Sequence, residues 1–232
     1  SDLTAGRRVA VTVARQAGER GRSASVSPQW RCTSAAGVDP RLNRRVVGRM
    51  PMPALQLTTE AGCALAIGRY PRFRYDARGG GGSGLLERPD GEGWRPLAFA
   101  TEGLSIPALS WRTTRVLGLP LPPGLTIRIA PQHLKGRWQP ASGALELDFL
   151  AHFAFAVGGV YRAPDLIVRT LLGTGQARGQ RHGAVGMPLD RDGRGVLVGV
   201  ARVEPTGEAW LDRFLGLPDE ALAVLRCQLL EG

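Results

Sequence analysis

The sequence is poor in the residues that most often bind metals or form disulfides. Its 232 residues include three histidines and three cysteines, and Cys32, Cys63 and Cys227 lie far apart with no CxxC pair. This spacing excludes an obvious zinc site and a complete disulfide framework, so we expect no metal and, by default, a reducing compartment. Lysine is scarce as well, because Lys135 is the single lysine among 30 basic residues.

Long apolar runs are also missing. Gly, Arg, Pro or His interrupts each apolar stretch before it reaches the roughly 18–20 residues of a membrane span. The first residues contain no apolar segment of the kind found in a secretory signal. We therefore expect a soluble or peripheral protein that is not secreted and has no transmembrane segment.

Motifs of cofactor sites and of nucleophilic catalysis are not found. The glycine-rich residues 79–84, GGGGSG, are followed neither by GK[ST] nor by a helix start, as a phosphate-binding loop would require. Ser83 lacks the flanking glycine of a nucleophile elbow, since Leu85 stands in its place. We expect no cofactor and no catalytic residue, and the sequence leans away from an enzyme without deciding the question.

Glu146, Asp148 and His152 are the best candidates for acid–base chemistry. They share one face of a predicted strand, where His152 is about 13 Å from Asp148, too far for a catalytic dyad. We expect the two acids to form ion pairs with Arg128 or Arg137 on a neighbouring strand.

Arginine is present in excess, and most of the excess lies in one third of the chain. Residues 1–78 hold 14 arginines against five acidic residues, a net charge of +9, whereas residues 79–232 have a net charge of +1. The Arg-, Ser- and Ala-rich first 45 residues are typical of an organellar transit peptide. We therefore predict a basic N-terminal arm, residues 1–50, and an organelle, a plastid more than a mitochondrion. The alternative is that the arginines reflect mutational bias and solubility.

The most informative stretch is residues 144–157, ALELDFLAHFAFAV. Apolar residues occupy its odd positions, and the even positions mix acids, His152 and alanines. A period of two predicts a β-strand with one apolar face. At about 3.3 Å per residue, the strand would be roughly 45 Å long. So long a strand either bends through a barrel or strongly coiled sheet, or pairs with different partners along its length.

The rest of the chain from residue 51 predicts one mainly β domain. Short strand-like runs alternate with turn sequences such as DGEG, LPPG and RDGRG, which is typical of an antiparallel barrel or a strongly coiled sheet. We expect flexible loops at residues 79–84 and 173–195. Short C-terminal helices are predicted, the first at residues 207–216, while residues 219–231 fit either a helix or a strand. The predicted strands are 54–59, 63–75, 95–100, 104–111, 115–117, 125–130, 135–138, 144–157, 166–172 and 196–203.

The apolar face of residues 144–157 provides the candidate ligand site. Small residues along this strand, Ala151, Ala154 and Ala156, leave room for a packed helix or an apolar ligand. At the level of fold alone, the pattern resembles lipocalin-like barrels and plastid lipid-associated barrels. That resemblance implies a lumen for a lipid, pigment or isoprenoid. The candidate ligand-binding residues are Leu145, Leu147, Phe149, Phe153 and Phe155.

Three functions follow as hypotheses. The first is a non-enzymatic barrel that binds an apolar ligand or docks on an anionic membrane surface. The second is an accessory or assembly subunit of a larger complex, and the third is an RNA-binding module that uses the aromatic and basic residues 69–78. The candidate contacts to anions or to a membrane are Arg69, Arg72, Arg74, Arg178 and Arg181.

Overall fold

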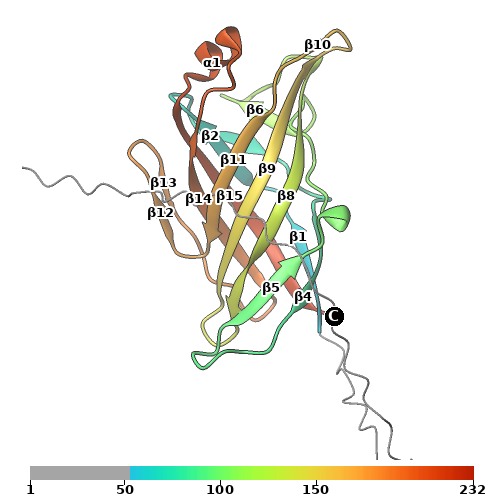
Figure 1. Cartoon of the computed structure of the whole chain (residues 1–232), viewed down its shortest axis with the longest axis vertical. Helices are drawn as coiled ribbons and strands as arrows, with labels where there is room; N and C mark the ends of the chain where they lie inside the picture. Colours follow the sequence, from blue (N-terminus) through green and yellow to red (C-terminus); the bar gives the residue numbers. More distant parts are fainter. Residues whose placement is uncertain (1–52) are drawn as a thin grey trace, which may run out of the picture. The chain divides into compact units, whose positions relative to one another are not determined.

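A computed structural model describes residues 53–232 of the chain. The predicted basic arm and the transit-peptide composition lie outside these described residues. The described part is mainly β, and its largest feature is one antiparallel sheet (Figure 1).

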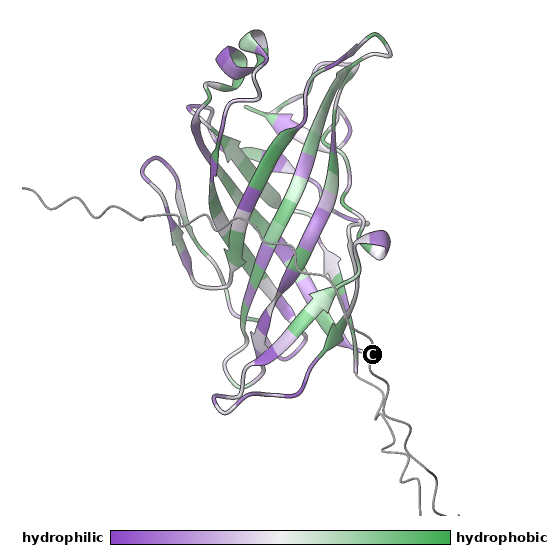
Figure 2. Cartoon of the chain, in the orientation of Figure 1, coloured by the Kyte–Doolittle hydropathy of each residue, from purple (hydrophilic) through white to green (hydrophobic). Residues whose placement is uncertain are grey.

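The central strand of the sheet is β9 (Ala144–Val157), with the bounds predicted from its alternating pattern. It pairs along its whole length with β8 (Leu125–Gln139), which is also long. The ladder shifts register between Pro131 and His133, since proline cannot donate to a ladder and a bulge accommodates it. Figure 2 shows apolar and polar residues alternating along these strands.

Eight strands of the sheet form a closed ring. Their order is β1-β4-β5-β8-β9-β11-β14-β15, and β15 pairs with β1 to complete the circuit. The remaining ring strands are β1 (Ala54–Thr59), β4 (Gly81–Leu86), β5 (Arg95–Phe99), β11 (Leu166–Gly173), β14 (Arg194–Val203) and β15 (Asp219–Glu231).

The other elements extend or flank the ring. From β15 the sheet continues through β2, β3, β6 and β7, and β10 pairs with the end of β9. The strands β12 and β13 form a separate hairpin. These elements are β2 (Cys63–Ile67), β3 (Phe73–Tyr75), β6 (Thr114–Val116), β7 (Leu119–Pro120), β10 (Tyr161–Arg162), β12 (Gln176–Arg178), β13 (Gly183–Val185), the 3₁₀ turn η1 (Thr101–Gly103) and the helix α1 (Ala209–Leu215).

Two long strands, β15 and β8, change partners along their length. The second half of β15 pairs with β1 and its first half pairs with β2. The second half of β8 pairs with β5, whereas its first half is met by an irregular segment, residues 104–113, through the bridge between Leu109 and Ile127. The prediction of a strand over residues 104–111 was therefore wrong, because isolated bridges and turns hold this segment.

The two ends of the ring are packed differently. At the end near the β8–β9 turn, which we call the filled end, side chains such as Leu55, Leu145 and Leu229 form a tight core. At the opposite end, which we call the α1 end, Leu211 and Leu215 of α1 pack against Phe155 and its neighbours. Figure 1 shows α1 and β10 together at that end.

The predicted flexible loop at residues 79–84 is mostly strand β4, so that prediction was wrong. The glycines are there because other chain segments come close. A Cβ on Gly84 would lie 2.8 Å from the Phe99 ring, and a Cβ on Gly81 would lie 2.0 Å from the Leu57 carbonyl oxygen. Gly81 also has a φ of 131°, which side chains rarely adopt.

The second predicted loop, residues 173–195, is also ordered in large part. It contains the end of β11, the β12–β13 hairpin and the start of β14. The Glu220 carboxylate accepts hydrogen bonds from the backbone amides of Gln180, Arg181 and His182, with distances of 2.7, 2.9 and 3.2 Å. These bonds fasten the loop to β15.

One C-terminal helix is present among the described residues. The helix predicted within residues 207–216 is confirmed as α1, and Gly216 ends it in the left-handed conformation with φ 74°. The open question at residues 219–231 resolves as a strand, β15, because this segment closes the ring between β14 and β1.

Candidate functional site

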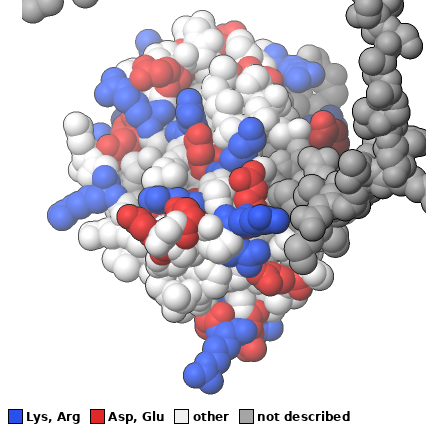
Figure 3. Space-filling view, turned by 60° about the horizontal axis from the view of Figure 1, so that its bottom comes forward, with Lys and Arg blue, Asp and Glu red and all other residues white. Residues whose placement is uncertain are grey.

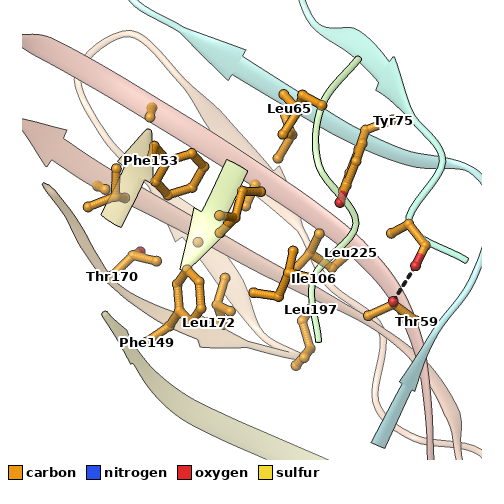
Figure 4. A pocket seen from close by; sticks show the side chains of 18 of the residues that line it. Thr59, Leu65, Tyr75, Ile106, Phe149, Phe153, Thr170, Leu172, Leu197 and Leu225 are labelled. Atoms are coloured by element: carbon orange, nitrogen blue, oxygen red, sulfur yellow. Dashed lines mark hydrogen bonds between the residues drawn. The ribbon is translucent and has the colours of Figure 1, made fainter. Parts of the chain in front are cut away.

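An apolar cavity of about 190 Å³ lies inside the ring, between the filled end and α1 (Figure 4). Strands on all sides of the ring contribute to its wall. Large apolar side chains make up most of the surface, among them Leu65, Ile106, Phe149, Phe153, Leu172 and Leu225. On the α1 side, Leu215 of the helix borders the cavity.

Four of the five predicted ligand-binding residues line this cavity. Leu147, Phe149, Phe153 and Phe155 project into it from β9, because alternate residues of a strand face the same side. Leu145 does not line it. Its side chain is fully buried in the filled end, where it packs with other leucines.

Three hydroxyl groups of the wall are bonded to the backbone, while Ser105 is exposed to solvent. Thr59 Oγ1 donates to the carbonyl of Ala77 at 2.5 Å, the bond drawn in Figure 4. Tyr75 Oη donates to the carbonyl of Pro107. Thr170 Oγ1 donates to the carbonyl of Val200 at 3.2 Å. These hydroxyl groups are satisfied without a ligand, so the surface offered to one is essentially hydrocarbon.

The cavity wall carries no charge at neutral pH. No Asp, Glu, Lys, Arg or His of the described chain lines it, and the ionisable groups that do are Tyr75 and Cys227. Burial raises the pKa of the Tyr75 phenol well above its ordinary value. Burial, with smaller contributions from Cys63 and Glu60, raises the pKa of the Cys227 thiol to about 12. Both groups are therefore protonated and neutral.

Sequence reasoning missed the rest of the wall. Leu65 and Ile67 belong to β2, whose alternation provided a usable signal. Ile106 and Leu109 belong to the irregular segment 104–113, which is positioned by the bridges of Ser105 to Gly81 and Leu109 to Ile127. Nothing in the local sequence of that segment indicates that it faces a cavity.

The acids of β9 lie on the outer face of the ring, away from the cavity. Glu146 pairs with Arg137 at 2.8 Å, as predicted. Asp148 pairs with Arg169 at 2.9 Å, and this bond, with its charge, lowers the pKa of the Asp148 carboxyl. Arg128 lies opposite Ala154 and is not the predicted partner of either acid.

His152 does not pair with Glu146 or Asp148. Its Nδ1 lies 3.6 Å from Asp165 Oδ2. Within residues 53–232, no group of three His, Cys, Asp or Glu side chains could hold a metal ion.

The predicted anion-contacting arginines are exposed, but the structure does not gather them into one site. Arg69 and Arg72 flank the β2–β3 turn, where Arg72 Nη2 donates to the Gly183 carbonyl. Arg74 faces Arg115 across the β3–β6 ladder, and Arg178 lies on β12. Arg181 pairs with Asp219 at 3.1 Å.

The aromatic residues of 69–78 do not form a stacking surface for nucleic-acid bases. Phe73 and Tyr75 point into the cavity. The Tyr70 ring packs against Phe214 of α1, with centroids 5.8 Å apart. The aromatic rings on which the RNA-binding hypothesis depends are therefore not available to stack on bases.

The described residues contain no helix that is both long and apolar enough to cross a membrane. Comparison of the chain with known protein families, with curated proteins and with solved structures finds no match.

Proposed function

We propose that this protein is a non-enzymatic antiparallel barrel that binds an apolar ligand of the lipid, pigment or isoprenoid class inside the ring. The observation that carries the proposal is the uncharged cavity of about 190 Å³, where the hydroxyl groups of Thr59, Tyr75 and Thr170 bond to the backbone. Burying an apolar ligand there leaves these three hydroxyl groups bonded and therefore desolvates little polar surface. Chemistry on the ligand would require an ionised or nucleophilic group, and the wall offers only neutral Tyr75 and Cys227.

The volume of the cavity indicates how large a ligand it can hold. An apolar cavity of about 150 Å³ stays dry and binds benzene. The present cavity therefore accommodates at least one ring or a short branched chain. Aromatic rings of β9 and aliphatic side chains of β2 and β15 face each other across it, so both flat and flexible hydrocarbon groups find van der Waals partners.

A neutral naphthylamine dye that fluoresces in apolar surroundings tests the proposal. We expect the full chain to enhance its emission, and a long-chain alcohol or isoprenoid to displace it. Native mass spectrometry of protein purified from its own source would identify the resident ligand. Absence of dye binding to folded protein would refute the proposal.

Paired variants locate the binding. Ala223 borders the cavity from β15, and Ala223→Phe would place a benzene-sized group in it. Ala154 lies on the even-numbered face of β9, opposite Arg128 and away from the cavity, so Ala154→Phe is the matched control. We expect Ala223→Phe to abolish dye binding without lowering the melting temperature, and Ala154→Phe to bind like the parent. Equal loss in both variants would place the dye elsewhere.

A further inference from the structure

The α1 end of the ring exposes apolar side chains on three separate projections. Leu117 and Leu119, at the β6–β7 turn, are 79% and 70% exposed. Val160, at the tip of the β9–β10 turn, is 97% exposed. Trp210 and Phe214 on α1 are about half exposed. We call these five residues the apical rim.

Contacts between the projections show that they surround the same end. Trp210 Nε1 donates to Tyr161 Oη at 2.7 Å, which joins α1 to the β9–β10 turn. The Gly158 amide donates to the Gly124 carbonyl at 2.9 Å, which joins that turn to the segment after β7. Figure 1 shows α1 and β10 at one end of the ring.

The helix α1 is apolar on both sides. Leu211 and Leu215 are buried against the ring, which satisfies the inward side. The outward side presents Trp210 and Phe214, four residues apart and packed together with ring centroids 6.4 Å apart. Exposing two large rings on a short helix costs free energy in water, so the outward side is suited to a less polar environment.

Three exposed arginines without an acidic partner in the described part of the chain accompany the apical rim. Arg213 is exposed on α1. Arg69 and Arg72 are exposed in the β2–β3 turn, which Tyr70 Oη joins to α1 by donating to the Phe214 carbonyl at 2.7 Å. None of the three has an acidic partner within ion-pair distance among residues 53–232. Among the nearby acids, Asp165, Glu204 and Asp219 pair with other arginines. Asp212 and Glu220 accept hydrogen bonds from backbone amides, which hold these carboxylates against the chain but leave them charged. Glu208, the residue before α1, is an acid at this end that takes part in neither kind of interaction.

The filled end has a different surface. Its turns use Asp90 and Asp190, whose carboxylates each accept two backbone amides at 2.9 Å. Figure 3, which brings this end forward, shows cations and acids interspersed. Such a surface favours water and carries no preference for one sign of charge.

We propose that the apical rim docks the protein on an anionic lipid bilayer. In this arrangement Trp210, Phe214 and Val160 enter the headgroup region and Arg69 and Arg213 contact lipid phosphates. A bilayer fits better than a protein partner because the apolar tips project from three separate segments, whereas protein interfaces need a continuous packed surface. This proposal does not depend on a ligand in the cavity. It adds that α1, which borders the cavity through Leu215, is also the helix at the membrane.

Site-specific fluorescence tests the orientation of the full chain on vesicles. A polarity-sensitive dye is attached to Val160→Cys and, separately, to Ala141→Cys, which lies in the turn at the other end of β9. Both variants carry Cys32→Ser, and the buried Cys63 and Cys227 do not compete for the dye. Vesicles of phosphatidylcholine, with and without phosphatidylglycerol, include lipids brominated on their acyl chains as quenchers.

We expect bromine to quench the dye at position 160 on anionic vesicles only and to leave the dye at position 141 unquenched. Sedimentation with vesicles without quenching at position 160 would overturn the proposal, because the Arg-rich residues 1–50 would then account for binding. Quenching at position 141, or absence of vesicle binding together with a stable protein partner at the rim, would also overturn it.

Substitutions measure the contribution of the rim. We expect Trp210→Ala with Phe214→Ala to weaken binding to anionic vesicles by about tenfold or more. Arg213→Gln should weaken it by about fivefold at low salt. Leu85→Ala with Leu230→Ala, two exposed leucines near the filled end, is the matched control and should have no effect. Dye binding in solution, without vesicles, reports separately on the proposed ligand function.

Discussion

Replacing Leu145 by alanine tests whether the filled end is a structural core distinct from the binding cavity. Leu145 is 0% exposed and packs among leucines of β1, β4 and β15. Deleting a fully buried leucine side chain removes its transfer free energy and leaves a hole, which together cost about 3–5 kcal/mol. Because no cavity borders this side chain, its neighbours have little freedom to relax, and we expect the upper part of that range.

Phe153→Ala is the comparison on the same strand. Phe153 is half-buried and borders the existing cavity, so its ring already lacks partners on one side. We expect a loss of about 2 kcal/mol, less than for Leu145→Ala although more atoms are removed. Phe153→Ala should also change dye affinity, since it enlarges the cavity, whereas folded Leu145→Ala should bind like the parent.

Urea unfolding followed by circular dichroism gives both free energies, and dye titration of the folded variants gives the affinities. The reasoning is refuted if Leu145→Ala costs less than Phe153→Ala. It is also refuted if folded Leu145→Ala no longer binds the dye, because the ligand would then occupy the filled end.

Two further predictions concern local packing and pH. Gly81→Ala should destabilise the protein by more than about 2 kcal/mol in urea unfolding, because its Cβ would meet the Leu57 carbonyl at an unfavourable φ, whereas Gly103→Ala, with open space around it, should be nearly neutral. Backbone hydrogen bonds from residues 180–182 lower the pKa of Glu220 from its ordinary 4.5, so its contribution to stability is present above pH 4.5 and is lost as the pH falls through the lowered value. The difference in unfolding free energy between the parent and Glu220→Gln should therefore be present at neutral pH and vanish in acid, and a difference that persists in acid would contradict this assignment.

The sequence predicted the parts of the fold that depend on local alternation. The bounds of β9 follow from its period of two, and Leu147, Phe149, Phe153 and Phe155 on its inward odd positions line the cavity. Leu145 belongs to the same pattern, and the pattern has no information on how far the filled core extends into the ring. That boundary is set by side chains from β1, β4 and β15.

Other features depend on contacts between distant segments. A glycine run is compatible with a flexible loop or with close approach of another chain, and only Leu57 and Phe99 decide for the second in β4. Residues 219–231 fit a helix or a strand, and pairing with β1 and β14 selects the strand. Ile106 reaches the cavity because bridges on either side fix its segment, which no local pattern encodes.

The seam between β1 and β15 has a consequence for folding. Thr58 and Gln228, which are bonded across it, are 170 positions apart in the sequence. Until β15 has been synthesised and has docked, the sheet remains open, with two unsatisfied edges and a hydrocarbon interior in contact with water. Closing so large a loop makes folding slow, and the open intermediate is the species most prone to aggregation or strand exchange between molecules. Yield during expression should therefore depend on how quickly this seam closes.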